Sequence, residues 1–163
     1  MQSPLGMWGW YSCIKAGTGS HGDIPRSIRR GLKPRRTNII AYEMIAAVAA
    51  IFMLDKIVPG QVCIRHFVDN TTAKTCIVSG HSKQEDLNNI VGLLWHTAAH
   101  RTLEYWNEWV QSQANLADAP SRRDCKLLKQ LQSTEIKLNF RQYLQVAESW
   151  QSDQRADKLM RPA

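Results

Sequence analysis

Apolar and polar positions along this chain predict strands that alternate with helices. Residues 63–69 have the composition of a strand buried inside a covered sheet, because most residues before Asp69 are apolar, β-branched or aromatic. Residues 70–72 are good helix caps, and they predict a helix that ends at Gly80. A strand that delivers an acid to the start of a helix is how open α/β sheets present metal and ligand groups. A plain capping role is the alternative reading of Asp69.

A second helix is predicted over residues 39–56, with Thr37 or Asn38 as its cap. It is apolar almost all round, which is typical of a helix buried against a sheet. Glu43 is its one interior charge, and it comes too late for a capping box. An unpaired buried carboxylate costs several kcal/mol, so Glu43 needs a metal, a water or a cation nearby. A structural salt bridge to an arginine is the alternative.

Further along, a helix over residues 83–100 and a strand over residues 102–110 are predicted. The sequence of residues 82–85 is a capping box, and apolar residues then recur at helical spacing. After the strand, a loop enters a helix at Asp118, which could serve only as its N-cap. We expect one domain over residues 1–125 and a helical extension over residues 126–163 with a frayed tail.

Two local patterns suggest binding sites that the residues themselves do not support. The glycine cluster at residues 17–22 lacks the Gly-Lys-Ser/Thr ending of a phosphate loop, so a hairpin turn is expected. His96 and His100 share a helix face, but Thr97 stands where a zinc protease has its glutamate. We interpret them as surface histidines.

Composition indicates a folded intracellular protein with an anionic partner. The chain has 163 residues, six tryptophans and a formal charge of +7, which favours nucleic acid as the partner. Its four cysteines are widely spaced, which is typical of a reducing compartment. The longest apolar run, residues 39–54, contains Glu43 and falls short of the roughly 20 residues of a membrane helix. No signal-peptide pattern is visible, so we expect a cytoplasmic or nuclear location and no membrane partner.

Three acids share an expected setting at the edge of a sheet. Glu43 lies in a buried helix, Asp69 ends a strand, and Asp118 sits where a loop enters a helix. Carboxylates gathered at one place repel each other unless cations neutralise them, and Mg²⁺ prefers such hard oxygen ligands. Two Mg²⁺ ions roughly 4 Å apart can drive phosphodiester hydrolysis.

The order of these motifs resembles the ribonuclease H domain of reverse-transcriptase retrotransposons. The matching segments are Asn-Ile-Ile-Ala-Tyr-Glu-Met-Ile-Ala around Glu43, Phe-Val-Asp-Asn-Thr-Thr-Ala around Asp69, and Asn-Leu-Ala-Asp-Ala-Pro-Ser-Arg around Asp118. The resemblance covers residues 3–124. It implies an α/β fold with a mixed sheet of about five strands flanked by helices, two Mg²⁺ ions held by the three acids, and hydrolysis of the RNA strand of RNA–DNA hybrids. An upstream reverse transcriptase of the same polyprotein is the implied protein partner.

Five further residues are candidates for contacting nucleic acid. Asn70 and Thr71 follow Asp69 and would lie near the minor groove of a hybrid, where 2′-hydroxyls are exposed. Arg35 and Arg36 belong to a cationic cluster at residues 26–36, which could contact phosphates or form a solvated loop. Arg122 follows the last acid.

One feature departs from the family pattern. The family's first strand carries an aspartate that bridges both metals, and this position falls at or before Met1. Asp23 is a poor substitute, so we expect a truncated first strand and an incomplete two-ion site. Two alternatives remain open: a non-catalytic nucleic-acid-binding remnant of a retroelement polyprotein, and an integrase-like nuclease. The latter usually ends its acid set with a glutamate on a helix, which Asp118 fits less well.

Overall fold

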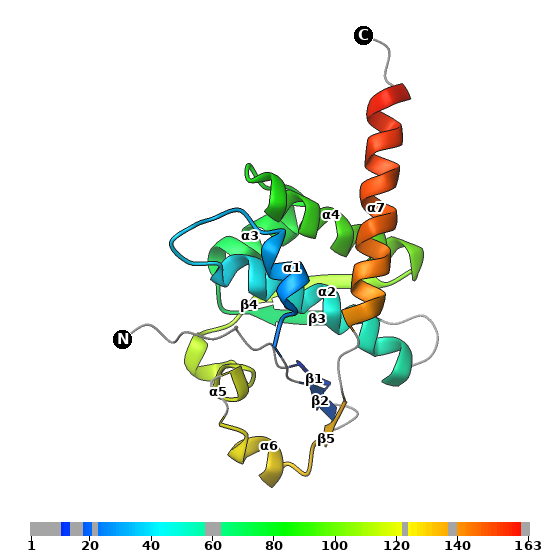
Figure 1. Ribbon diagram of the computed structural model, residues 1–163. Helices are drawn as coiled ribbons and strands as arrows, with labels where there is room; N and C mark the ends of the chain where they lie inside the picture. The colour runs from blue at the N-terminus through cyan, green and yellow to red at the C-terminus, as the bar shows by residue number, and fades with distance from the viewer. Residues whose placement is uncertain are drawn as a thin grey trace.

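The computed structural model describes residues 11–13, 18–20, 23–57, 63–121, 124–136 and 140–160, and these form a mixed α/β fold (Figure 1). The strands are β1 (Tyr11–Cys13), β2 (Thr18–Ser20), β3 (Cys63–Val68), β4 (Glu104–Trp109) and β5 (Thr134–Glu135). The helices are α1 (Arg26–Arg30), α2 (Ile39–Ile57), α3 (Thr71–Ser79), α4 (Glu85–His100), the 3₁₀ turn η1 (Ser112–Ala114), α5 (Asp118–Ser121), α6 (Lys126–Gln130) and α7 (Phe140–Met160). Helices therefore alternate with the longer strands, as the apolar pattern predicts.

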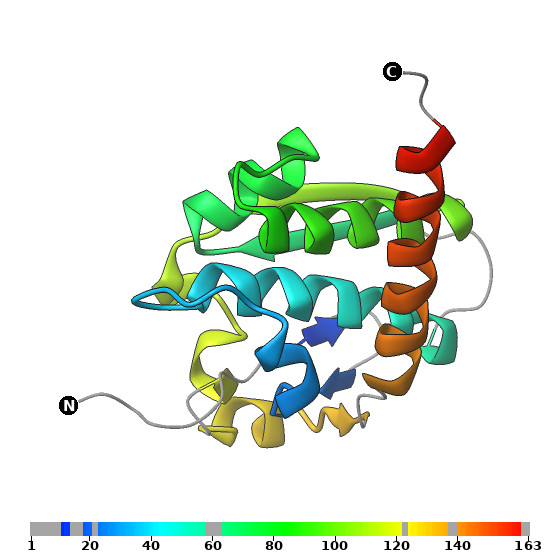
Figure 2. The same ribbon diagram turned by 45° about the horizontal axis from the view of Figure 1, so that its top comes forward.

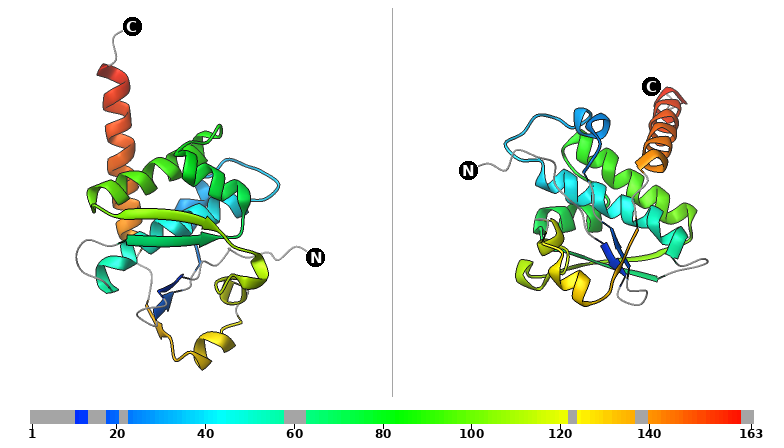
Figure 3. Two further views of the ribbon diagram at one scale, coloured as in Figure 1. Left: turned by 180° about the vertical axis from the view of Figure 1, so that it is seen from behind. Right: turned by 60° about the horizontal axis from the view of Figure 1, so that its bottom comes forward.

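The described strands form two sheets, whereas the resemblance implies a single sheet of about five strands. One sheet has the order β1-β2-β5, with β1 antiparallel to β2 and β2 parallel to β5. The other is the parallel pair β3-β4, in register from Cys63 opposite Glu104 to Val68 opposite Trp109. In Figures 1 and 3, β1 is the strand of its sheet that lies nearest β3. The sheets are separate because no described strand pairs with both β1 and β3.

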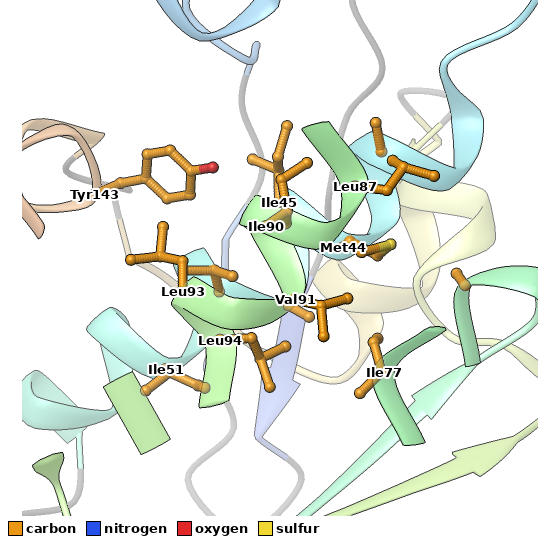
Figure 4. Close-up of a cluster of buried hydrophobic side chains, with 14 of the residues drawn as sticks. Met44, Ile45, Ile51, Ile77, Leu87, Ile90, Val91, Leu93, Leu94 and Tyr143 are labelled. Carbon is orange, nitrogen blue, oxygen red and sulfur yellow. The ribbon is translucent and has the colours of Figure 1, made fainter. Parts of the chain in front are cut away.

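The core lies between α2 and α4, which run side by side (Figure 2). α7 crosses both helices and adds the buried ring of Tyr143. Figure 4 shows how side chains from these helices and from α3 meet. The fully buried large side chains are Met44, Ile45, Val48, Ile51, Ile77, Val91, Leu93 and Leu94. Each contributes about 1.5–3 kcal/mol by leaving water, which explains why α2 is apolar on most of its circumference.

The ends of α2 and α3 agree with the predictions from sequence. Asn70 caps α3, because its Oδ1 accepts hydrogen bonds from the backbone N–H groups of Thr72 and Ala73 at 3.0 and 3.1 Å. Gly80 closes the helix with a φ of 66°, a conformation that glycine adopts at little cost. At the start of α2, the Thr37 hydroxyl accepts a hydrogen bond from the Ile39 N–H at 3.3 Å.

The predicted start of α4 was wrong by two residues, and the expected capping box does not form. Gln84 is the N-cap and its side chain makes no capping bond. The Ser82 hydroxyl instead accepts a hydrogen bond from the Gln84 N–H at 3.2 Å. In addition, the Ser82 N–H donates to Asn88 Oδ1 at 3.0 Å. These bonds hold residues 82–84 in a turn, so the helix begins at Glu85.

The prediction that β3 is covered on both faces was also wrong. Val68 is buried, but Cys63 is exposed and Phe67 is 46% exposed. On the neighbouring strand, Trp106 is 66% exposed. Figure 3 (left) views β3 and β4 from this side, and no described helix lies in front of them. One face is open because α2, α3 and α4 all pack on the other.

The remaining predictions concern the chain ends. β1 and β2 pair antiparallel, but the turn expected over residues 17–22 was misplaced, because Thr18–Ser20 form strand β2; residues 14–17, 21 and 22 lie outside the described part. The predicted frayed tail was wrong in part, because α7 continues as a helix to Met160. Its first half is fixed by packing on α2 and α4. Within the described residues, every helix is too short or too polar to cross a bilayer.

Candidate functional site

Glu43 and Asp69 come together at one end of the molecule. Glu43 lies in the second turn of α2, and Asp69 directly follows β3. Figure 2 shows that α2 begins at the same end of the fold at which β3 finishes. The pKa of Glu43 is raised to about 7, first by burial and second by the negative charge of Asp69, while the polar groups of Asn70 act in the opposite direction. The two acids are therefore near enough to interact electrostatically, and their role as metal ligands stays a prediction.

One carboxylate oxygen of the Glu43–Asp69 pair lacks a hydrogen-bond partner. Glu43 Oε2 is buried and has no hydrogen-bond partner. A buried carboxylate oxygen next to a second carboxylate is costly unless it is protonated or binds a cation. The donors are hard oxygens, so Mg²⁺ or Mn²⁺ fits the chemistry of the pair. Glu43 and Asp69 could thus hold one divalent cation.

Asp118 lies at the start of α5 and does not complete a three-acid cluster. Its backbone N–H donates to the Asn115 carbonyl at 3.0 Å, and Asn115 Oδ1 accepts from the Ala117 N–H at 3.0 Å. Within the described residues, no group of three or more histidine, cysteine, aspartate or glutamate side chains is placed to hold a metal ion. The loop that leads to Asp118 nevertheless starts at the same sheet edge as Asp69, because the Val110 N–H donates to the Val68 carbonyl at 2.9 Å. Asp118 therefore lies outside any such group among the described residues, and its role as a metal ligand stays a prediction.

The five candidate nucleic-acid contacts fall in different settings. Thr71 and Arg36 are exposed, whereas Asn70 is used by the cap of α3. Arg35 is bound to Asp86, with side chains 16% and 7% exposed respectively. Arg122 lies outside the described residues. Arg35 thus has a structural partner that the sequence did not reveal, while nucleic-acid contact by the five residues stays a prediction.

Sequence reasoning missed Trp109, which contacts the turn that carries Asp69. The indole Nε1–H of Trp109 donates to the Asp69 carbonyl at 3.1 Å, and the side chain is 47% exposed. The position of Trp109 at the end of the predicted strand over residues 102–110 could have indicated this contact. Parallel strands that end in register bring the residues at their ends close together. Trp109 therefore ties the end of β4 to the acid-bearing turn.

A polar network also lies along the acid-bearing strand. Tyr105 Oη and Asn107 Nδ2 lie 2.6 and 3.0 Å from His66 Nδ1. Loss of hydration lowers the pKa of His66 to about 4, so the ring is neutral and Nδ1 can accept. The alternation of residues 64, 66 and 68 against 105, 107 and 109 places these groups on one face of the β3-β4 pair. The network stabilises the strand pair that delivers Asp69.

His96 and His100 contact each other, as their spacing predicts. Their ring centroids lie 4.3 Å apart, and His96 also lies 5.0 Å from the ring of Trp150. Among the described residues no third metal ligand joins them. His100 is exposed, as the interpretation of surface histidines requires, whereas His96 is partly buried.

Comparison with known proteins does not identify a relative. No protein-family model, no curated protein and no solved structure matches this chain. The functional argument therefore rests on the residues and on their geometry.

Proposed function

We propose that this chain is a ribonuclease H-type domain of retroelement descent, whose acid site serves metal-dependent hydrolysis of the RNA strand of RNA–DNA hybrids. The observation that carries the proposal is the meeting of Glu43 and Asp69, with Glu43 Oε2 buried and without a partner. Acids that repel each other are retained together at the end of a strand when they serve a cation or a proton. Their order along the chain and their motifs are those of the family that the sequence resembles.

The sheet arrangement supports the same proposal. β1 and β3 are both edge strands among the described residues, and they belong to neighbouring sheets. A strand between them would join the two sheets into one mixed sheet of the size that the resemblance implies. In the family, the first strand carries the remaining aspartate. We propose that the equivalent of that strand would lie between β1 and β3.

Magnesium is the proposed cofactor. Glu43 and Asp69 would hold it, and Asp118 would join them once the site is complete. Bound there, the ions would supply an activated water and stabilise the leaving oxygen in phosphodiester hydrolysis. The chain's own part is to hold the two acids at the end of β3, and its charge of +7 favours the approach of a nucleic acid. An RNA–DNA hybrid and an upstream reverse transcriptase are the proposed partners, and an intracellular location is proposed with them.

A non-catalytic nucleic-acid-binding remnant is the second candidate. The observation that favours it is that Asp118 does not join the other two acids in a metal cluster. This candidate requires salt-sensitive binding to a hybrid without cleavage, because affinity then depends on phosphates contacted by cations. The exposed Arg36 is one such contact, and Arg36→Ala should weaken binding and reduce the salt slope by about 1.

Cleavage of a labelled RNA–DNA hybrid in Mg²⁺ or Mn²⁺ tests the proposal. We would compare this chain with a version extended by an aspartate-bearing first strand, and use Glu43→Gln and Asp69→Asn as controls. Cleavage by the extended chain that both substitutions abolish supports the nuclease. Binding without cleavage by either chain supports the remnant. If neither chain binds or cleaves the hybrid, both candidates are wrong.

A further inference from the structure

We propose that the exposed arginines of α1, Arg26 and Arg30, form a docking site for the phosphate backbone of a nucleic acid. This inference rests on the proposed function and deepens it, because it names a surface, separate from the acid pair, that would hold the hybrid. The sequence marks residues 26–36 as cationic, and the structure separates the cations that serve the fold from those that do not.

Two cations of this segment are already occupied. Lys33 and Arg35 are bound to acids in the first turn of α4. Arg26 and Arg30 are exposed, and among the described residues neither has an ion-pair partner. Their charges are therefore available to an external anion.

Helix stability alone does not explain the charges on α1. Arg26 is the first residue of the helix, where the helix dipole repels a cation, and the first turn holds no acid. Arg30 suits the C-terminal end, but it lies one turn from Arg26 on the same face, so the two like charges repel each other. Arg29 adds to this excess, because its Nε is buried and has no hydrogen-bond partner among the described residues. The arginines of α1 thus lack acceptors, which an anion would supply.

α1 is anchored on the fold and presents the two arginines at its outside (Figure 1). Ile28, midway between them, is 8% exposed and belongs to the hydrophobic core, as does Ile24 just before the helix. The Arg29 N–H donates to the Pro25 carbonyl at 3.1 Å, which closes the first turn. One side of the helix is therefore fixed by packing, and the exposed arginines are held in a constant relation to the fold.

The chemistry of the pair favours a phosphate backbone. Four residues of helix separate Arg26 from Arg30 by about 6 Å along the axis, so the two side chains can contact different phosphates of one strand. A guanidinium donates paired hydrogen bonds to phosphate oxygens and keeps its charge at physiological pH. The net charge of +7 adds long-range attraction for the same partner. Such contacts supply affinity and orientation without reading the base sequence.

Substitution of both arginines tests the site. Arg26→Gln/Arg30→Gln is compared with Lys83→Gln/Lys129→Gln, which lowers the net charge equally at exposed positions elsewhere. Binding of a fluorescent RNA–DNA hybrid is measured by anisotropy in EDTA at about 50–200 mM salt. We expect the arginine variant to bind about tenfold more weakly and to reduce the salt slope by about 2, while the lysine variant stays close to the parent.

Two further measurements separate phosphate contact from an effect on the fold. Arg26→Lys/Arg30→Lys keeps both charges, so it should keep the salt slope of the parent. The urea midpoints of all these variants should equal that of the parent, because the replaced side chains are exposed.

Each outcome decides between this inference and the proposed function. Equal losses in the arginine and lysine variants would overturn the inference, because binding would then follow net charge alone. An unchanged slope in the arginine variant would overturn it too, and would leave the proposed nuclease standing. Since EDTA removes the metal, an arginine-dependent slope in a protein that never cleaves in Mg²⁺ would support this site and contradict the nuclease. A parent that binds no hybrid would contradict the site itself.

Discussion

Arg35 Nη2 donates hydrogen bonds to both carboxylate oxygens of Asp86, at 2.6 Å from Oδ1 and 2.5 Å from Oδ2. The backbone N–H of Lys33 adds a third bond to Asp86 Oδ2 at 2.9 Å. Burial alone would raise the pKa of Asp86, but these bonds outweigh it and hold that pKa below its usual value. The pair ties the segment before α2 to the first turn of α4, where an acid also suits the helix dipole.

Removing Asp86 should strongly destabilise the fold. We expect Asp86→Ala to lower the free energy of unfolding by about 3–5 kcal/mol, because it leaves a largely buried guanidinium without its partner. Urea unfolding at pH 7 measures this loss. Lys33→Ala is the control, since it removes only an exposed ion pair with Glu85 and keeps the backbone bond, so its urea midpoint should hardly move. Equal losses in the two variants would show that the Arg35–Asp86 pair is not a structural anchor.

Glu43→Gln should stabilise the cation-free protein above neutral pH. The pKa of Glu43 is about 7 in the fold and 4.5 without the fold, so the folded state binds the extra proton between these values. Stability from this group is therefore fully present below pH 4.5 and lost as the pH rises through 7. At 1.36 kcal/mol per pKa unit, and allowing for the partial exposure of Glu43, the gain in Glu43→Gln at pH 8 is about 2 kcal/mol.

Urea unfolding at pH 8 and pH 5 checks this prediction. The gain should shrink at pH 5, and Mg²⁺ should stabilise the parent more than Glu43→Gln. Glu104→Gln, an exposed substitution on β4, is the control and should behave like the parent at both pH values. A pH-independent effect of Glu43→Gln would mean that Glu43 carries no shifted titration.

His66 should give the opposite pH dependence. Its pKa falls from 6.5 to about 4 in the fold, so the unfolded chain binds the proton first. Stability is then lost as the pH falls from 6.5 towards 4, by roughly 3 kcal/mol. His66→Gln keeps an acceptor for Tyr105 but does not titrate, so it should remove this acid sensitivity. Unfolding should be compared in the Glu43→Gln background, which removes the opposing slope, and an unchanged acid sensitivity would contradict the assignment.

The features that the sequence predicts well are those that local chemistry decides. Asn70 and Gly80 define the two ends of α3 through their own side-chain and backbone properties. The apolar run of α2 requires burial wherever the helix packs. The meeting of Glu43 and Asp69 follows from a buried helix and a strand end that both carry an acid.

The features that the sequence does not predict depend on contacts between residues that are far apart in the chain. Arg35 is 51 residues from Asp86, so its binding partner cannot be read from its cationic neighbours. The composition of β3 predicts a strand but does not reveal that the helices pack on only one of its faces. The other face, which carries Phe67, is therefore exposed. The capping pattern at residues 82–85 predicts a helix that starts at Lys83. It does not reveal that Asn88, inside that helix, holds Ser82 in a turn by accepting its N–H. The position of Asp118 relative to the other acids depends on the path of the loop after β4, which the local sequence does not determine.

The packing of α7 on α4 depends on Gly92. A Cβ at this position would lie 2.6 Å from Cζ2 and 3.1 Å from Cε2 of Trp150. We expect Gly92→Ala to destabilise the fold, because overpacking costs about 1–3 kcal/mol and exceeds the roughly 0.5–1 kcal/mol that alanine gains in a helix.

A double-mutant cycle tests this contact directly. In a Trp150→Leu background the clash is relieved, so Gly92→Ala should become neutral or stabilising by up to about 1 kcal/mol. Urea unfolding of the four proteins gives the coupling energy between the two positions. Additive effects would mean that α7 does not pack on α4 at Gly92. A coupling above about 1 kcal/mol would establish that this part of residues 126–163 shares one core with the helix that lies beside α2.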